Sequence, residues 1–256
     1  LMLLTNGCSF VWGDELEGFD ESPPSHGHLT FTAILAGHLG VPYMNLATCG
    51  GCNQKIFRDT VDWLSKEEKP SHVVVIWSAW QREEVAENHP KGYEQDIKIK
   101  RYECMTQISP SRVNICKPEL KDALDRYYDV HDTIRTGMIR TLTYMTALQT
   151  MCDAMDIKLV QGVFHERMWQ NYLDFMKPRY RKSKEPWTEW MNHIQREMEG
   201  LHDRCRLGLG RYKDLFSLGK EQYQIKDHGH PDEDTQVHYA DLLLHIFNTQ
   251  FEVEDD

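Results

Sequence analysis

The chain has 256 residues, and this length predicts one globular domain over 1–256. Of these residues, 40% are apolar and 27% are charged, a composition that excludes a fibrous or disordered chain. Its 29 basic and 40 acidic residues give a net charge of -11, which repels polyanions, so we expect no nucleic-acid partner. No apolar run has membrane-spanning length, so we expect a soluble protein. The seven cysteines are odd in number, and we therefore expect reduced thiols. Because no charged leader precedes the first apolar run, we expect the protein in the cytoplasm of the producing cell.

The first predicted element is a buried strand that ends in a tight turn. An apolar run predicts the strand, Gly7 follows it, and Cys8 and Ser9 come next. In α/β folds a turn of this kind holds a nucleophile at the carboxyl edge of the sheet. Ser9 is therefore the candidate nucleophile, and Gly7 is expected to give the turn room.

A βαβ unit follows this strand. The apolar spacing predicts a helix over 29–39, closed by a glycine, and then a short strand over 41–46. A strand, a helix and a second strand in this order predict a parallel sheet. The second strand leads to Gly50, and another helix begins near Asn53. Glycine at such a junction lets the backbone approach a ligand and leaves N–H donors at the helix start.

Two cysteines at the same junction support a different class of function. The Cys49-x-x-Cys52 spacing between a strand and a helix is also typical of a thioredoxin-like dithiol. A metal site that includes Cys8 is a variant of this hypothesis, although our main prediction includes no metal. A third interpretation is that small buried cysteines simply fill space around a tight loop.

The middle of the chain alternates clear elements with insertions. The β-branched run over 72–77 predicts a strand covered on both faces. We expect an irregular insertion or cap over about 83–131, since insertions at a carboxyl edge commonly cover a pocket. A long helix from Asp132 or Thr133 and a strand over 157–164 follow. A helical insertion over about 166–206 carries an amphipathic helix that packs on the domain or mediates self-association.

The carboxyl-terminal block supplies partners for the serine. Asp227 lies three residues before His230, and an amphipathic helix over 235–245 follows. An aspartate at this spacing can orient the imidazole of the histidine. With Ser9, these residues complete a set of nucleophile, base and orienting group.

The first and last blocks together resemble the SGNH (GDSL-type) hydrolase superfamily, whose serine lies near the amino terminus and whose Asp-x-x-His lies near the carboxyl terminus. The first block reads Gly-Cys-Ser-Phe from Gly7, similar to a subgroup common in tailed phages. The resemblance implies a flavodoxin-like three-layer α/β/α sandwich with a central parallel sheet plus insertions, and no cofactor. It also implies that His230 activates Ser9 and that Asp227 supports His230.

The resemblance further implies an oxyanion site that begins with the N–H groups of Ser9 and Gly50, with Gly51 as the alternative to Gly50. The third block departs from the pattern, because the resembled hydrolases place Gly-x-Asn-Asp after the third strand and use the asparagine amide as a donor. Here Trp80 stands in the place of that asparagine. Gln81 or Arg82 could enter the same space as an alternative donor. Loss of one oxyanion donor costs on the order of a hundred-fold in rate.

The sequence therefore predicts a serine esterase that acts on a small-molecule or glycan ester, with a carbohydrate deacetylase preferred on the resemblance. Asn53 and Trp80 are expected to contact the substrate. One alternative is a non-catalytic binding or virion-associated module, and the missing third-block asparagine favours it. A second alternative is a thiol or metal protein that uses Cys49 and Cys52.

Overall fold

The computed structural model describes part of the chain, which is residues 1–13, 16, 27–66, 68–86, 105–108, 126–127, 133–164 and 231–251. These residues form β1 (Leu3–Asn6), α1 (Ser9–Trp12), α2 (Phe31–Leu39), β2 (Tyr43–Asn45), α3 (Asn53–Leu64), β3 (His72–Trp77), β4 (Glu83–Ala86), β5 (Met105–Ile108), α5 (Thr133–Ala154), β6 (Lys158–Val163) and α9 (Glu233–Phe251).

The central sheet has the strand order β2-β1-β3-β6, and its neighbouring strands are parallel. β1 lies between β2 and β3, with Thr5 opposite Asn45 and Asn6 opposite Val75. Parallel strands present their carboxyl ends at the same edge of the sheet, so the segments that follow β1, β2, β3 and β6 meet there. The parallel sheet predicted from the sequence is confirmed.

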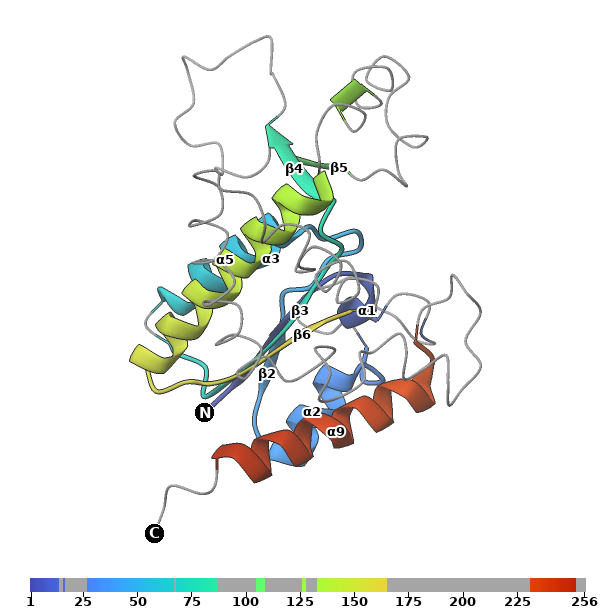
Figure 1. The fold of residues 1–256 in the computed structure, drawn as a ribbon. Helices are drawn as coiled ribbons and strands as arrows, with labels where there is room; N and C mark the ends of the chain where they lie inside the picture. Colours follow the sequence, from blue (N-terminus) through green and yellow to red (C-terminus); the bar gives the residue numbers. More distant parts are fainter. Residues whose placement is uncertain are drawn as a thin grey trace, which may run out of the picture.

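Helices cover both faces of the sheet, which gives three layers (Figure 1). Val74 and Ile76 of β3 pack in one apolar cluster with residues of α2 and α9, such as Leu243. Val73 and Val75 pack in a second cluster with residues of α3 and α5. Because successive strand residues point to opposite faces, a strand covered on both faces must be apolar throughout. This is why β3 reads as an unbroken β-branched run.

The ends of two helices follow their local sequence. Thr30 precedes α2, and its Oγ1 accepts a hydrogen bond from the Ala33 N–H at 3.3 Å. Gly40 ends α2 with φ of 65°, the left-handed conformation that favours glycine, as the sequence predicted. Asp232 precedes α9, and its Oδ1 accepts from the Thr235 N–H at 2.9 Å. Both starts therefore have a side-chain cap.

The segment predicted as an irregular insertion contains regular structure. β4 and β5 pair antiparallel within it, with Glu83 opposite Ile108. The prolines and mixed charge of the surrounding sequence hid this pair from pattern reasoning. The predicted helical insertion over about 166–206 lies outside the described residues, and the single-domain assignment stays a prediction. Within the described stretches, no helix is long and apolar enough to cross a membrane.

Candidate active site

Ser9 lies in a one-turn helix directly after the central strand β1. Cys8 precedes the helix in an extended conformation, and its carbonyl oxygen accepts hydrogen bonds from Val11 and Trp12, each at 3.0 Å. Gly13 ends the turn with φ of 87° and donates its N–H to the Ser9 carbonyl oxygen at 3.1 Å. The side chain of Ser9 is thus held at the carboxyl edge of the sheet, where the sequence predicted it, and the residue is 5% exposed.

Gly7 makes this turn possible. A Cβ at position 7 would lie 3.0 Å from the Ile76 carbonyl oxygen and closer still to Cγ2 of Val11. The Gly7 N–H donates to Oδ1 of Asn6 at 2.8 Å, which fixes the start of the turn. The prediction that glycine gives the turn room is confirmed, because β1, β3 and α1 approach too closely here for any side chain.

The loop that carries Gly50 lies against the serine turn. Gly50 is buried and has φ of 74°, a left-handed conformation. A Cβ on Gly51 would lie only 2.9 Å from the Gly7 carbonyl oxygen. The Thr48 N–H also donates to that oxygen, at 3.4 Å. The structure therefore brings the loops of Ser9 and Gly50, the two predicted oxyanion donors, into direct contact.

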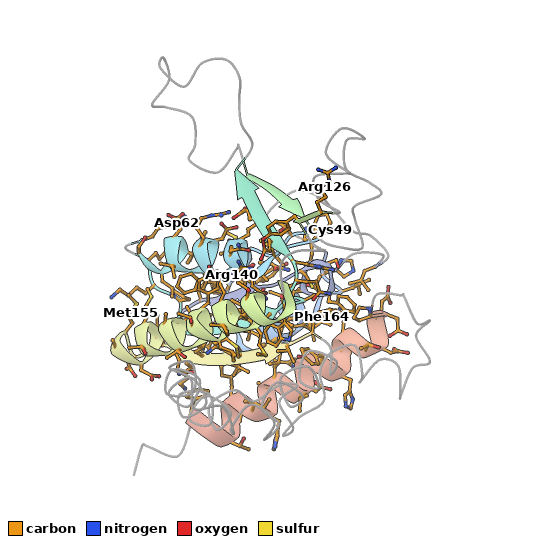
Figure 2. The ribbon with its side chains drawn as sticks, turned by 45° about the horizontal axis from the view of Figure 1, so that its top comes forward. Cys49, Asp62, Arg126, Arg140, Met155 and Phe164 are labelled. Carbon is orange, nitrogen blue, oxygen red and sulfur yellow. The ribbon has the colours of Figure 1, made fainter. Side chains whose placement is uncertain are left out.

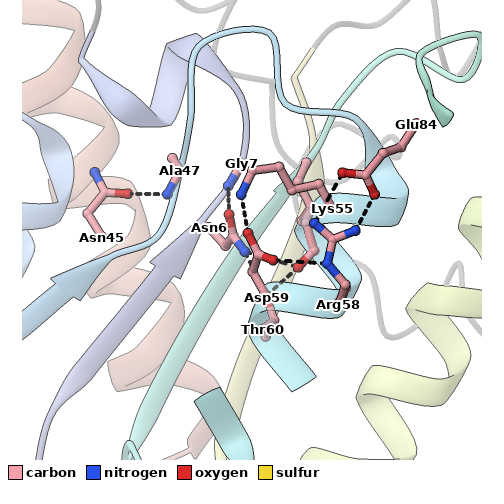
Figure 3. Close-up of polar contacts among 10 residues, drawn as sticks. Asn6, Gly7, Asn45, Ala47, Lys55, Arg58, Asp59, Thr60 and Glu84 are labelled. Atoms are coloured by element: carbon pink, nitrogen blue, oxygen red, sulfur yellow. Dashed lines mark hydrogen bonds and ion pairs between the residues drawn. The ribbon is translucent and has the colours of Figure 1, made fainter. Parts of the chain in front are cut away.

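Asparagines at the strand ends tie these loops in place (Figure 3). Asn45, the last residue of β2, donates from Nδ2 to the Val11 carbonyl oxygen at 2.8 Å and accepts from the Ala47 N–H at 3.1 Å. Asn6, the last residue of β1, donates from Nδ2 to Oγ1 of Thr60 at 3.0 Å. No sequence motif indicated a role for these asparagines. The feature that could have indicated one is an asparagine at the carboxyl end of an apolar strand, because a buried amide there needs hydrogen-bond partners.

Asn53 fastens the loop that follows β3. Its Oδ1 accepts from the Ser78 N–H at 2.7 Å, and its Nδ2 donates to the Ser78 carbonyl oxygen at 2.9 Å. The same Nδ2 donates to Oγ1 of Thr141 in α5 at 2.8 Å. The side chain is 1% exposed, and these contacts join α3, α5 and the loop after β3. The contact between Asn53 and substrate stays a prediction.

The third-block loop places a tryptophan in the core. Trp80 is 2% exposed and belongs to the apolar cluster between the sheet and the helices α3 and α5. Its carbonyl carbon lies 2.6 Å from where a Cβ on Gly137 would stand, so α5 approaches this loop closely. Gln81 and Arg82 follow and are half-buried. Of these residues, Arg82 donates from Nη1 to Oγ of Ser78 at 2.9 Å.

Asp227 and His230 lie outside the described residues, which resume at Pro231. The helix that follows them, α9, is bound to the serine turn through one buried glutamine. Gln236 donates from Nε2 to the Phe10 carbonyl oxygen at 3.3 Å, and its Oε1 accepts from the Phe31 N–H at 2.9 Å. The first turns of α9 therefore touch the residue that follows Ser9. Sequence reasoning did not identify Gln236.

The cysteines at this edge carry reduced thiols in the structure, namely Cys8, Cys49 and Cys52. Burial raises the pKa of Cys52 to about 11. A thioredoxin-like dithiol needs the opposite shift, toward a thiolate near neutral pH. Among the described residues, no three His, Cys, Asp or Glu side chains gather in a way that could hold a metal ion.

Comparison with protein families gives one match. Residues 17–132 match a family of unknown function (DUF6071). This range includes Gly50 and Arg82 but not Ser9. No curated protein matches the sequence.

Comparison with solved structures identifies the fold. The carbohydrate esterase family 2 enzyme with a carbohydrate-binding domain from Corynascus thermopiles (Myceliophthora fergusii) aligns with a TM-score of 0.50 and 12% identity, over 98% of this chain and 66% of that one. A protein assigned to the G-D-S-L family of lipolytic proteins from Desulfitobacterium hafniense DCB-2 aligns with a TM-score of 0.46 and 10% identity, over 96% and 98%. The chain shares the fold of the Corynascus thermopiles enzyme, with a parallel central sheet between two layers of helices (Figure 1).

The psychrotrophic esterase EstA from Pseudoalteromonas sp. aligns in the same way, with a TM-score of 0.47, 10% identity and 98% of each chain covered. At an identity of 12%, the match to the Corynascus thermopiles enzyme shows the fold alone. The three-layer α/β/α architecture with a central parallel sheet, predicted from the sequence, is therefore confirmed (Figure 1).

Proposed function

We propose that this protein is a serine ester hydrolase of SGNH type, with Ser9 as nucleophile, His230 as base and Asp227 as the group that orients the base. The proposal rests mainly on the contact between the serine turn and the Gly50 loop. A Cβ atom added to Gly51 would lie only 2.9 Å from the Gly7 carbonyl oxygen. Two segments about 40 residues apart in the sequence thus meet at the carboxyl edge, as a nucleophile and an oxyanion donor must.

In the proposed reaction, Oγ of Ser9 attacks the ester carbonyl carbon while its proton passes to His230. The negative charge that forms on the carbonyl oxygen is held by the N–H groups of Ser9 and Gly50. The intermediate then expels the alcohol, which takes the proton from His230 and leaves an acyl-serine. Water attacks the acyl group in the second half of the cycle, with His230 again taking and returning a proton.

The position of α9 supports the assignment of the base. Asp227 and His230 immediately precede Pro231, which is buried. Five residues further on, Gln236 donates to the Phe10 carbonyl oxygen at 3.3 Å. The chain that carries the proposed base therefore leads directly into a helix that contacts the serine turn.

We propose an acetylated carbohydrate as the substrate, with no cofactor. This class follows from the resemblance of the sequence blocks to SGNH hydrolases. It also matches the carbohydrate esterase activity named for the structural neighbour from Corynascus thermopiles.

The experiment that tests this function is covalent labelling with a fluorophosphonate probe, followed by mass mapping of the labelled peptide. We expect labelling at Ser9 and its loss in both Ser9→Ala and His230→Ala, because phosphonylation requires a serine activated by a base. A folded wild-type protein that stays unlabelled, or a His230→Ala variant that labels as fast as the wild type, would contradict the proposal.

One observation favours a second candidate, a binding module on a disabled hydrolase scaffold. Trp80 stands where the resembled hydrolases have a donor asparagine, and its side chain is in the core. Removal of one oxyanion donor reduces kcat by about a hundred-fold or more. On this second hypothesis the protein binds the glycan ester without labelling at Ser9, so the same probe experiment separates the two functions.

A further inference from the structure

Arg82 carries a positive charge that no carboxylate within the described part of the chain neutralises. It follows the strand β3 at the carboxyl edge, and its side chain is half-buried. Its Nη1 donates to Oγ of Ser78 at 2.9 Å, which uses one of the five N–H donors of the guanidinium. The guanidinium is thus anchored through Nη1, and within the described ranges no other hydrogen bond uses its remaining donors.

The acidic residues next to Arg82 are already paired with other arginines. Oε1 of Glu83 accepts from Arg140 in α5 at 2.8 Å, and Oε2 of the same carboxylate accepts from the hydroxyl of Tyr127. Both oxygens of Glu84 accept from Arg58 in α3, one of them at 3.1 Å (Figure 3). The two glutamates next to Arg82 are therefore paired elsewhere, and no other carboxylate among the described residues pairs with the guanidinium.

An aromatic ring connects this charge to the serine turn. Cζ of Arg82 lies 5.9 Å from the ring centroid of Phe164, within the range of a cation–π contact. Phe164, labelled in Figure 2, follows β6, and its ring centroid lies 5.3 Å from that of Phe10. Phe10 follows Ser9 in α1. The ring of Phe164 contacts both the guanidinium of Arg82 and the ring of Phe10. We therefore expect the guanidinium to bind a part of the substrate that is several bonds away from the reacting carbonyl group.

We propose that Arg82 binds a carboxylate of the substrate, so that the preferred substrate is an ester of an acidic compound, such as an acylated acidic sugar. The inference rests on the proposed esterase function and specifies its substrate class. Arginine recognises carboxylates through paired, charge-assisted hydrogen bonds. In a protein with a net charge of -11, an anionic substrate requires such a local cation to offset the general repulsion.

The test compares meta- and para-acetoxybenzoate with their methyl esters, which differ in the charge of the carboxyl group. Release of the phenol is followed for the wild type, Arg82→Gln and Arg82→Lys. We expect the wild type to prefer the carboxylates. We expect Arg82→Gln to lower kcat/KM for the carboxylates about tenfold or more, through KM, and to leave the methyl esters within about twofold. Arg82→Lys should retain part of the preference, because it keeps the charge but loses the paired geometry.

Lys66→Gln is the matched control, since it removes the same charge from an exposed residue beyond the far end of α3. It should leave the preference unchanged. An equal loss on both kinds of ester in Arg82→Gln would show that Arg82 is an oxyanion donor and would overturn the inference. So would an Arg82→Gln variant that keeps the full preference for carboxylates.

A binding measurement separates this inference from the proposed function. Calorimetry compares para-hydroxybenzoate with its methyl ester on Ser9→Ala and on Ser9→Ala/Arg82→Gln. We expect tighter binding of the carboxylate that disappears in the double variant. Equal binding of the two compounds to Ser9→Ala overturns the inference even if hydrolysis proceeds. Hydrolysis that persists unchanged in Ser9→Ala contradicts the proposed function and leaves the binding result standing.

Discussion

At the serine turn, β1 can lead directly into α1 only because Gly7 has no side chain. Gly7 lies between the Ile76 carbonyl oxygen and the side chain of Val11, and a Cβ has no room there. The need for glycine comes from the close approach of three elements. A residue far along the chain, Ile76, is one of the two neighbours that impose it.

We therefore expect Gly7→Ala to lower the free energy of unfolding by about 1–3 kcal/mol, because an added methyl group in a filled site forces its neighbours apart. The matched control is Gly37→Ala in α2, where a Cβ meets nothing within 4 Å. That variant should be more stable by up to about 1 kcal/mol, since alanine favours the helix. Urea unfolding of the two variants checks the pair, and equal effects would contradict the steric argument.

Among the elements, the helices α3 and α5 and the loop after β3 are joined by the amide of Asn53. This side chain satisfies both the N–H and the carbonyl oxygen of Ser78. The same loop leads to Trp80 and Arg82. The geometry of the third block thus depends on a residue at the start of a helix, 25 positions earlier.

Asn53→Ala should lower the free energy of unfolding by about 2–4 kcal/mol, because it leaves two buried backbone groups of Ser78 without a partner. Thr141→Val is the control, since it removes only one of the three contacts and keeps the volume. We expect it to cost about 1 kcal/mol. The measurement is urea unfolding at one pH. A Thr141→Val variant as unstable as Asn53→Ala would show that the contact with Ser78 is not the important one.

At the scale of the whole molecule, the last described helix completes the core formed by the first strand. Residues of α9, including Tyr239, Leu243 and Ile246, pack in one cluster with Leu3 of β1 and Phe31 of α2. Gln236 binds the same helix to α1 and α2. Because the two ends of the described chain share one apolar cluster, we expect them to unfold as one cooperative unit.

Leu243→Ala should consequently destabilise the whole domain by about 2–5 kcal/mol, because it opens a cavity in the core. The matched control is Val237→Ala on the same helix, where the side chain is 44% exposed and the change should stay within about 0.5 kcal/mol. Tryptophan fluorescence and circular dichroism should report a single shifted urea transition for Leu243→Ala. Two separate transitions would show that α9 is not part of the same unit.

The sequence by itself determined most of the described fold and the place of Ser9, the proposed nucleophile. Apolar runs of period two or of unbroken β-branched residues specify strands such as β3, and helical spacing specifies α2 and α5, because these patterns are set by local geometry. The left-handed Gly40 was also readable, since few residues tolerate that conformation. The glycine of the serine turn was predicted as well, although its neighbours Ile76 and Val11 were not. The resemblance of the end blocks added Ser9, Asp227 and His230 to this prediction.

Only the tertiary structure decided which side chains fasten the site and which charge has no carboxylate partner in the described part of the chain. The roles of Asn45, Asn53 and Gln236 depend on partners that lie far away in the sequence, and no local pattern encodes a hydrogen bond across such a distance. The same holds for Arg82, because the two glutamates that follow it in the sequence pair with Arg140 and Arg58 instead. The hydrophobic period of a sequence indicates which face of a helix or strand is buried. Which polar side chains pair with each other depends on how these elements pack together in the folded chain.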